Sequence, residues 1–443
     1  MKTCLTAKNV DLELMYTLFL LLLVISALVL PAQEQDGPQL PIILEHADSM
    51  VGIGPTETGI REFLGNVRFV QGNVTVTCDR AVHSVSTNQA DFYGRVAVRQ
   101  GNVIINAPYL SYNGATHLGI APRGIKVLEG ASAITARHGT YSTTSHIATF
   151  ADSVVAVDDS VQIWADTLVY DRDADTTFAS GSVFLSDVLG TFWIAGDRAF
   201  RDVNAGLMRM WGSAASWQWD STDAGDTIYV AADTLIVNRA LGKSSYVAIS
   251  RAELIRGGVS ARSDSMNYSS MTERFDLRGH PILWSDSLLL IADTIVALVP
   301  GRKLHSVLGM SHALLISQTD TLFPDRFDQI SGDQILLSIS EDTVRRLTST
   351  GNAQSITFRA EATRPEGLAK VAADTIRAMF HAGQLSDVYW LGGIEGEHHP
   401  EPVVAGRAQE YRLLGFVWRT DRPTIRPLAK PFAIPVVRVG SEK

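Results

Sequence analysis

The fold of this chain is decided by the eight residues IWADTLVY at Ile163–Tyr170, because their central pattern returns along the sequence. The tetrapeptide Ala-Asp-Thr-Leu/Ile starts at Ala165, Ala232, Ala292 and Ala373. Relaxed copies place a small residue, most often followed by Asp, at Ala47, Cys78, Ala107, Ala136, Gly196, Ser263 and Gly332. The three successive steps from Cys78 to Ala165 are each 29 residues long. This spacing indicates a repeat array of about eleven units.

The apolar positions around each small residue predict a bent strand. In most copies an aliphatic residue lies two positions before the small residue and another lies three positions after it, as Ile163 and Leu168 do around Ala165. Because side chains alternate between the two faces of a strand, Ile163 and Ala165 share a face, and Leu168 would fall on the other face of a straight strand. Keeping all three inward requires a bulge or a bend, which the small residue and its Asp favour.

A glycine about sixteen residues after the small residue predicts a second corner. These glycines are Gly94, Gly124, Gly181, Gly212, Gly279 and Gly309. Turn sequences such as Gln100-Gly101-Asn102 and Asn113-Gly114 fall midway between corners. Each repeat then contributes two antiparallel strands, each bent near its middle. We expect an all-β fold, an elongated antiparallel array of bent strands whose sheet is creased into a V in cross-section.

The inward positions of this creased sheet are aliphatic and provide few polar groups. The candidate groove-lining residues are Ile105, Leu110, Ile134, Ile163, Leu168, Ile194, Val230, Leu235, Leu290 and Ile295. Burial of apolar surface, at about 25 cal/mol per Å², would make such a groove attractive to acyl chains. The same pattern would also produce a fully packed β-solenoid that holds no ligand, so both interpretations stay open. An open strand at either end would allow the sheet to continue into another protein of the same kind.

The N-terminal segment, residues 1–32, is expected to be a signal peptide or a membrane anchor. Met15–Pro31 is almost entirely apolar and follows Lys2 and Lys8, which is typical of a secretory signal, although its length is at the short limit for a membrane span. Either role places the bulk of the chain outside the cytoplasm. The remaining organisation is a linker at 33–43, the repeat region at 44–396 in two or more modules, and a Pro-rich basic tail at 397–443.

Composition and motifs favour a protein that is not an enzyme. The formal net charge of −9 gives no reason to expect nucleic acid as a partner. Cys78 would be the one cysteine left after removal of the leader that contains Cys4, so neither a disulfide nor a cysteine-rich metal site is expected. Nucleophile-elbow, P-loop and zinc-protease motifs are absent from the sequence. We expect no catalytic residue, no metal and no cofactor.

Three other groups of residues each allow a functional and a structural interpretation. The Asp that recurs in the repeats could suggest calcium, but hydrogen bonding at the corners is favoured because the dense Gly-Asp runs of calcium β-rolls are missing. His398 and His399 lie among glutamates and could suggest zinc, although a solvated loop is favoured. Trp211, Trp217 and Trp219 would edge a binding mouth, touch a membrane or, as we favour, fill a gap in the core.

The basic tail also has two interpretations that the sequence leaves open. Its cationic residues are Arg407, Arg412, Arg419, Arg422, Arg426 and Lys430. They would contact anionic lipid head groups or a partner protein, or they would belong to a simple solvated tail.

The repeat resembles the OstA-like/LptA family of lipopolysaccharide transport proteins. The resemblance is carried by Ile163–Tyr170, by Ile105–Tyr112, and by strands that open at Gly65 and Gly94, and it spans about residues 44–396. It implies a periplasmic β-jellyroll or β-taco, associated with the outer membrane, that shields the acyl chains of lipopolysaccharide or another acylated lipid. It also implies partners of the same Lpt type, joined end to end, through which the protein would be membrane-associated.

Two further interpretations are kept beside this resemblance. One is a sealed β-solenoid that acts as a surface or adhesin-like protein. The other is a β-helix enzyme that acts on polysaccharide, which would require a unique patch of Asp, Arg or Lys on one face, and the sequence shows none. The family's single-domain bridge protein is much shorter than this chain, so a version with several modules is expected.

Overall fold

The computed structural model describes residues 42–428, apart from 56, 158–160, 220–226, 241–242, 286, 319–322, 342, 362–363 and 382–383. The predicted leader at residues 1–32 lies outside the described residues. Within the described part of the chain, no helix is both long enough and apolar enough to cross a bilayer.

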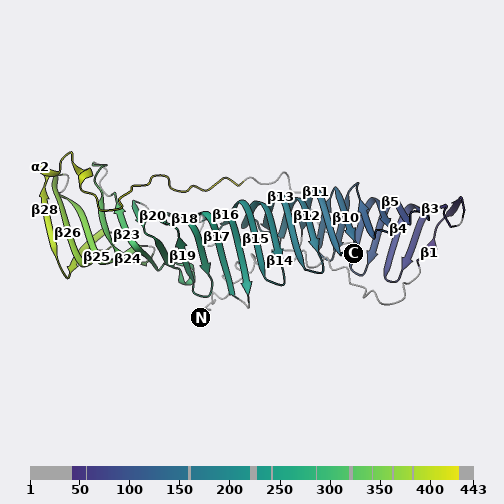
Figure 1. Ribbon diagram of the computed structural model, residues 1–443, viewed down its shortest axis with the longest axis horizontal. Helices are drawn as coiled ribbons and strands as arrows, with labels where there is room; N and C mark the ends of the chain where they lie inside the picture. Colours follow the sequence, from purple (N-terminus) through teal and green to yellow (C-terminus); the bar gives the residue numbers. More distant parts are fainter. Residues whose placement is uncertain are drawn as a thin grey trace, which may run out of the picture. The chain divides into compact units, whose positions relative to one another are not determined.

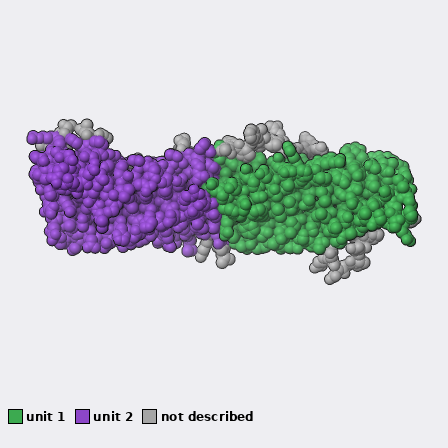
Figure 2. All heavy atoms as spheres, turned by 45° about the horizontal axis from the view of Figure 1, so that its top comes forward, with its two compact units in different colours: residues 1–214, 428–443 green, residues 215–427 purple. Residues whose placement is uncertain are grey.

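The chain divides into two compact units, which are coloured separately in Figure 2. Unit 1 comprises residues 1–214 with 428–443, and unit 2 comprises residues 215–427. Both units consist of β-strands that follow one another along the chain (Figure 1). Consecutive strands pair antiparallel, as the successive pairs of β3, β4, β5 and β6 illustrate. This confirms the all-β fold of antiparallel strands that the repeat predicted.

The strands of unit 1 are β1 (Ile43–His46), β2 (Ser49–Ile53), β3 (Ile60–Gln71), β4 (Val74–Ser84), β5 (Gln89–Gln100), β6 (Val103–Asn113), β7 (Leu118–Ala121), β8 (Ile125–Glu129), β9 (Ser132–Ala136), β10 (His138–Ser142), β11 (Ile147–Val157), β12 (Val161–Asp171), β13 (Thr176–Asp187) and β14 (Phe192–Asp202). Strand β15 (Leu207–Trp219) contains residues of both units.

Unit 2 continues with β16 (Thr227–Ala240), β17 (Lys243–Arg256), β18 (Val259–Ser269), β19 (Arg274–Arg278), β20 (Ile282–Ser285), β21 (Leu288–Ile291), β22 (Thr294–Leu298), β23 (Ser306–Ser317), β24 (Asp328–Ser340), β25 (Thr343–Glu361), β26 (Arg364–His381), β27 (Gln384–Leu391) and β28 (Glu395–Pro400). Short helical segments lie at η2 (Pro300–Arg302), α2 (Glu401–Val404) and η3 (Ala408–Glu410).

The predicted corners are present, and the two kinds of corner lie side by side on neighbouring strands. Between β12 and β13 the register jumps from Trp164 to Thr167 on β12 and from Phe184 to Ser180 on β13. Gly181 has a φ of +77°, and a Cβ added there would overlap the carboxylate of Asp166. The glycine therefore supplies both a left-handed backbone and room for the Asp side chain.

The same contact between a glycine and an Asp recurs in both units. The pairs are Gly65 with Asp48, Gly94 with Asp79, Gly181 with Asp166, Gly212 with Asp197, Gly279 with Asp264, Gly351 with Asp333, and Gly392 with Asp374. At several corners the Asp also accepts a side-chain hydrogen bond, for example from Arg95 Nε to Asp79 Oδ1 at 2.9 Å and from Ser250 Oγ to Asp233 Oδ2 at 2.6 Å. The expected hydrogen bonding at the corners is therefore confirmed at these Asp residues.

The prediction that Gly309 forms a corner was wrong. Gly309 lies in the regular part of β23, where it pairs with Ile295 and Ile335. The strand bends instead at Ser311 and His312, which have φ values of +61° and +51°. His312 Nδ1 lies 2.8 Å from Asp293 Oδ2. A polar pair beside the Asp can thus occupy the left-handed positions that glycine occupies at other corners.

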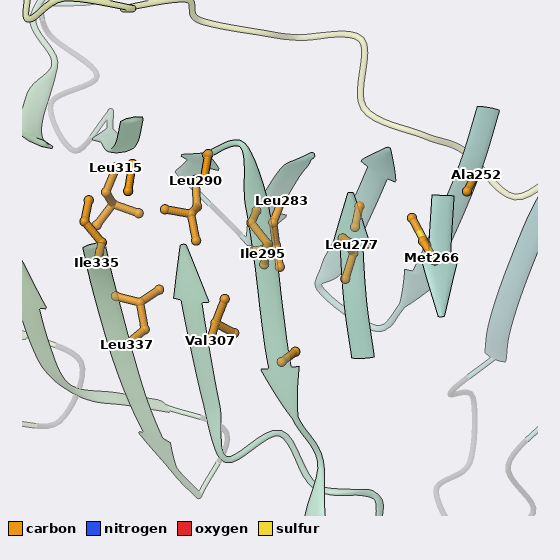
Figure 3. Packing of buried hydrophobic residues seen from close by; sticks show 14 of the residues in the cluster. Ala252, Met266, Leu277, Leu283, Leu290, Ile295, Val307, Leu315, Ile335 and Leu337 are labelled. Atoms are coloured by element: carbon orange, nitrogen blue, oxygen red, sulfur yellow. The ribbon is translucent and has the colours of Figure 1, made fainter. Parts of the chain in front are cut away.

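The core of unit 2 lies between the two halves of its bent strands. Figure 3 shows Leu290, Ile295, Leu315 and Ile335 pointing toward one another from successive strands. Leu290, Ile295 and Ile335 are fully buried. Because Leu290 precedes a corner and Ile295 follows it, their meeting in one cluster requires the phase change that the sequence predicted.

In unit 1, Cys78 behaves as a small core residue. It packs with Phe63, Val67, Ala81 and Val96 and is 5% exposed. Burial raises the pKa of its thiol to about 11, above the ordinary range of a cysteine.

We therefore expect Cys78 to resist alkylation in the folded protein. At pH 8 the thiol stays protonated, and the thiolate is the reactive form. Iodoacetamide should label Cys78 at least tenfold faster in urea than in buffer, measured by intact-protein mass spectrometry. Equal labelling rates in the two conditions would show that the site is open to solvent.

Candidate functional site

The interior of the creased sheet is the candidate site, since it collects the predicted groove-lining residues. In unit 1, Ile163 and Leu168 line one cavity of about 30 Å³ together with Ala179, Val183 and Leu185. Ile163 lies before the Asp166 corner and Leu168 lies after it. The two side chains nevertheless face the same space, as the bulge requires.

The other predicted residues also lie in the apolar interior of their own unit or at its margin. Those that are buried are Ile134, Ile163, Leu168, Ile194, Leu290 and Ile295. Those that are partly buried are Ile105, Leu110, Val230 and Leu235. Val230 and Leu235 pack against the cluster that contains Leu290, and Leu110 packs against the cluster around Cys78.

This interior is closely packed. Leu168, Leu290 and Ile295 are each 0% exposed. A cavity of about 30 Å³ accommodates one or two water molecules but no acyl chain. An acyl chain between Ile163 and Leu168 would have to push the two halves of the bent strands apart, which would exchange contacts between side chains for contacts with the hydrocarbon.

In unit 2 the sheet also buries the opposite, outward face of one half of its strands. Leu290 and Leu315 point into the interior cluster, whereas their neighbours Leu289 and Leu314 belong to a second cluster. Since consecutive residues of a strand face opposite sides, this second cluster lies on the outward face. Its other buried members are Trp284, Ile316, Phe327, Ile356 and Leu413.

The segment that covers this outward face is residues 411–427, which we call the C-terminal strap. Its side chains Tyr411, Leu413, Phe416 and Trp418 belong to or pack against the outward cluster. The rings of Phe416 and Trp418 lie 5.4 Å and 4.9 Å from the ring of Phe327. Figure 1 shows the strap running back along unit 2 from α2.

Hydrogen bonds from buried side chains fix the path of the strap. Trp284 Nε1 donates to the carbonyl of Arg419 at 2.9 Å, and Trp217 Nε1 donates to the carbonyl of Arg426 at 3.0 Å. Gln329 is 2% exposed, donates from Nε2 to the carbonyl of Tyr411 at 3.1 Å, and accepts from the backbone N–H of Leu413 at 2.8 Å. These contacts join residues that are far apart in sequence.

The strap also explains residues whose roles the sequence left open. Arg419 and Arg262 both bind Asp421, and these hydrogen bonds hold the pKa of the Asp421 carboxyl well below its usual range. Arg422 donates from Nε to Ser260 Oγ at 2.7 Å. The described part of the basic tail is therefore docked on its own unit, and a simple solvated tail does not describe it. Lys430 lies outside the described residues.

The tryptophans and histidines singled out earlier occupy structural positions. Trp217 is buried beneath the strap, with its ring 5.6 Å from that of Tyr229, and Trp211 lies 6.1 Å from Phe178. His398 and His399 lie on β28, paired with β26, so the prediction of a solvated loop there was wrong.

The outward cluster could have been inferred from continuous apolar runs. Leu288–Ile291 and Ala313–Ile316 have no polar residue, whereas a strand with one solvated face alternates. Such runs indicate burial on both faces. They do not indicate which segment provides the second cover.

Arg201 is a charged residue that faces the interior of unit 1. It lines the same cavity as Ile163 and Leu168, and the residue is 8% exposed. Its Nη1 atom has no hydrogen-bond partner. The sequence did not identify this residue, because a single Arg in an alternating strand does not indicate whether its side chain points inward or outward.

Strands at the ends of the described chain expose apolar side chains. In unit 1, β1 and β2 both pair with β3, and Ile43, Met50 and Ile53 are more than half exposed. In unit 2, β27 and the residues after it expose Leu385 and Ile394. Within the described residues no cluster of three His, Cys, Asp or Glu is arranged to hold a metal ion.

The chain is similar to known proteins over part of its length. Residues 39–185 match the family described as OstA-like protein. Among solved structures, the chain is similar to LptH from Pseudomonas aeruginosa, described as the LptA homologous periplasmic component of the conserved lipopolysaccharide transport device. The identity is 19%, the match covers 24% of this chain and 74% of that one, and the TM-score is 0.22. No curated protein matches the chain significantly.

Proposed function

Residues 39–185 belong to the OstA-like family, and from that premise we propose that this chain is a component of lipopolysaccharide transport. In this proposal it is a periplasmic protein, associated with the outer membrane through partners, that shields acyl chains inside its creased sheet. It acts passively, without a cofactor and without catalysis, and the energy for movement comes from other proteins.

The observation that carries the proposal is that aliphatic side chains from both sides of a corner face the same interior. Ile163 and Leu168 in unit 1, and Leu290 and Ile295 in unit 2, place hydrocarbon on both sides of a corner. Aliphatic walls bind acyl chains through apolar burial, which specifies neither chain length nor head group. A guest chain would replace contacts between the two halves of the strands with contacts of the same kind.

The exposed end strands support association with a second protein of the same architecture. Ile43 on β1 and Met50 on β2 are apolar and exposed, and a strand edge of this kind can pair with another strand. We propose that β-taco proteins of the Lpt type join end to end at such strands.

The close packing of the interior favours one competing function, a sealed β-solenoid that acts as a surface or adhesin-like protein. The cavity beside Ile163 and Leu168 has a volume of about 30 Å³, close to that of one water molecule. If the two halves of the strands never separate, no acyl chain enters, and the apolar interior serves stability alone.

Photo-crosslinking in cells distinguishes the two functions. A photoreactive phenylalanine at Ile163, Leu168 or Ile295 should form adducts with an acylated lipid, because these side chains face the interior. The same residue at Gln162, the neighbour of Ile163 on β12, should form few, since it faces outward. The adducts are measured by mobility shift and by immunoblotting for lipopolysaccharide.

A yield at Ile163 and Leu168 that is at least fivefold above that at Gln162 would support the groove. Equal yields at all sites, or adducts with protein alone, would favour the sealed solenoid.

A further inference from the structure

A cation is buried inside the apolar interior of unit 1. On β14, Ala199 pairs with Ala179 and Arg201 pairs with Thr177, and alternation places both Ala199 and Arg201 inward. Arg201 is four residues beyond Asp197 at the corner, whereas Ala199 is two residues beyond it. Its side chain thus lies about 7 Å farther from the crease than that of Ala199, nearer the free edge of the wall.

The charge of Arg201 is incompletely balanced. Nη1 is buried without a hydrogen-bond partner, although buried guanidinium groups are normally paired. The carboxylate of Asp175 attracts the cation but also accepts a hydrogen bond from Tyr170 Oη at 3.4 Å. Burial lowers the pKa of Arg201 to about 10, so the group remains charged at neutral pH.

The surroundings of Arg201 combine this cation with aliphatic surface. Leu168, Ile163 and Met208 line the same cavity. A guanidinium presents a planar set of N–H donors that matches the oxygens of a phosphate or a carboxylate. Aliphatic side chains lie toward the crease and the cation lies toward the free edge. This arrangement matches an anionic lipid, which has hydrocarbon chains at one end and a charged group at the other.

We propose that Arg201 binds the anionic oxygen group, phosphate or carboxylate, of an acylated lipid whose hydrocarbon occupies the interior of unit 1. This inference rests on the proposed function and adds to it a fixed position for the charged end of the lipid. The ligand would complete the hydrogen bonds of Nη1. Arg201 would then favour acidic lipids over neutral lipids with the same chains.

Calorimetric titration of the full chain with two matched pairs of probes tests the proposal. Dioctanoyl phosphatidic acid is compared with dioctanoylglycerol, and decanoate with decanol. The wild-type protein should bind the acidic member of at least one pair about tenfold more tightly, as expected for a charge-assisted hydrogen bond. The pair that shows this difference identifies the group as phosphate or carboxylate.

Arg201→Gln should reduce that difference to less than twofold and leave the affinity for the neutral probe unchanged. Arg198→Gln is the matched control, because Arg198 lies on the same strand and is exposed. It should keep the wild-type difference. If the preference came from the positive charge of the surface, both variants would lower the difference between acidic and neutral probes equally. That result would overturn the assignment to Arg201.

Two further results separate the possible failures. If the wild-type protein binds none of the probes, the proposed function fails and this inference fails with it. If Arg201→Gln keeps the wild-type preference, only the inference fails. Arg201→Met should unfold at the same temperature as the wild type or higher, because it removes an unpaired buried charge, and a lower temperature would assign Arg201 a structural role instead.

Discussion

Ending the chain at Arg407 is expected to destabilise unit 2 by about 5 kcal/mol or more, because the C-terminal strap is lost. Leu289, Leu314 and Ile316 are buried at 0–3% exposure on the outward face, and the strap packs against them. The buried Trp284 would also lose its acceptor, the carbonyl of Arg419. Urea unfolding followed by tryptophan fluorescence, together with binding of a hydrophobic dye, measures the effect.

Two adjacent leucines in the strap provide the matched control. Leu413 is 5% exposed within the outward cluster, whereas Leu414 is 98% exposed. Leu413→Ala should cost about 2–5 kcal/mol, and Leu414→Ala should stay within about 0.5 kcal/mol of the wild type. Equal effects of the two substitutions, or a shortened chain as stable as the full one, would show that the strap does not stabilise the sheet.

Gly181→Ala is expected to destabilise the corner between β12 and β13 by about 2–4 kcal/mol. Alanine disfavours the φ of +77° at this position, and its Cβ would also overlap the side chain of Asp166. Because Asp166 and Gly181 form the crease, strands β12 to β14 should lose protection first. Amide hydrogen exchange measured by mass spectrometry on peptides from these strands reports the local loss.

Gly101→Ala separates the effect of the positive φ from the effect of the overlap with a neighbouring side chain. Gly101 also has a positive φ, +55°, but a Cβ there would meet nothing within 4 Å. The substitution should cost only about 1 kcal/mol, the backbone contribution alone. In a background with Asp166→Gly, Gly181→Ala should cost at least about 0.5 kcal/mol less than it does alone. If Gly181→Ala cost no more than Gly101→Ala, and cost the same with or without Asp166, the contact between Asp166 and Gly181 would not stabilise the corner.

The corners could be predicted because their signals are local. Ile163 and Leu168 lie five residues apart, and strand alternation alone requires a phase change if both are to be inward. The Asp and glycine of neighbouring corners could be recognised separately, but their direct contact could not. The prediction of a corner at Gly309 was wrong because Ser311 and His312, beside Asp293, adopt the left-handed backbone instead.

The strap could not be predicted, because its contacts are non-local. Trp217 and Arg426 are separated by 209 residues, and Trp284 and Arg419 by 135. The basic residues suggested a solvated tail, a lipid contact or a contact with a partner protein, since charge alone does not specify whether the partner of a charged side chain lies within the same chain. The unbroken apolar runs at 288–291 and 313–316 are typical of strands buried on both faces, but they do not specify which segment covers the second face.

By itself, the sequence determined that the aliphatic residues around the small residue of a repeat share one face and that the strand bends between them. Both properties depend on neighbours a few residues apart: alternation with a period of two, and small residues where the backbone turns back. The tertiary structure alone decided that the interior is closely packed, that the strap covers the outward face of unit 2, and that Arg201 is buried without a full set of partners. These features depend on contacts between segments that are far apart in the sequence, and a local sequence pattern does not specify such contacts.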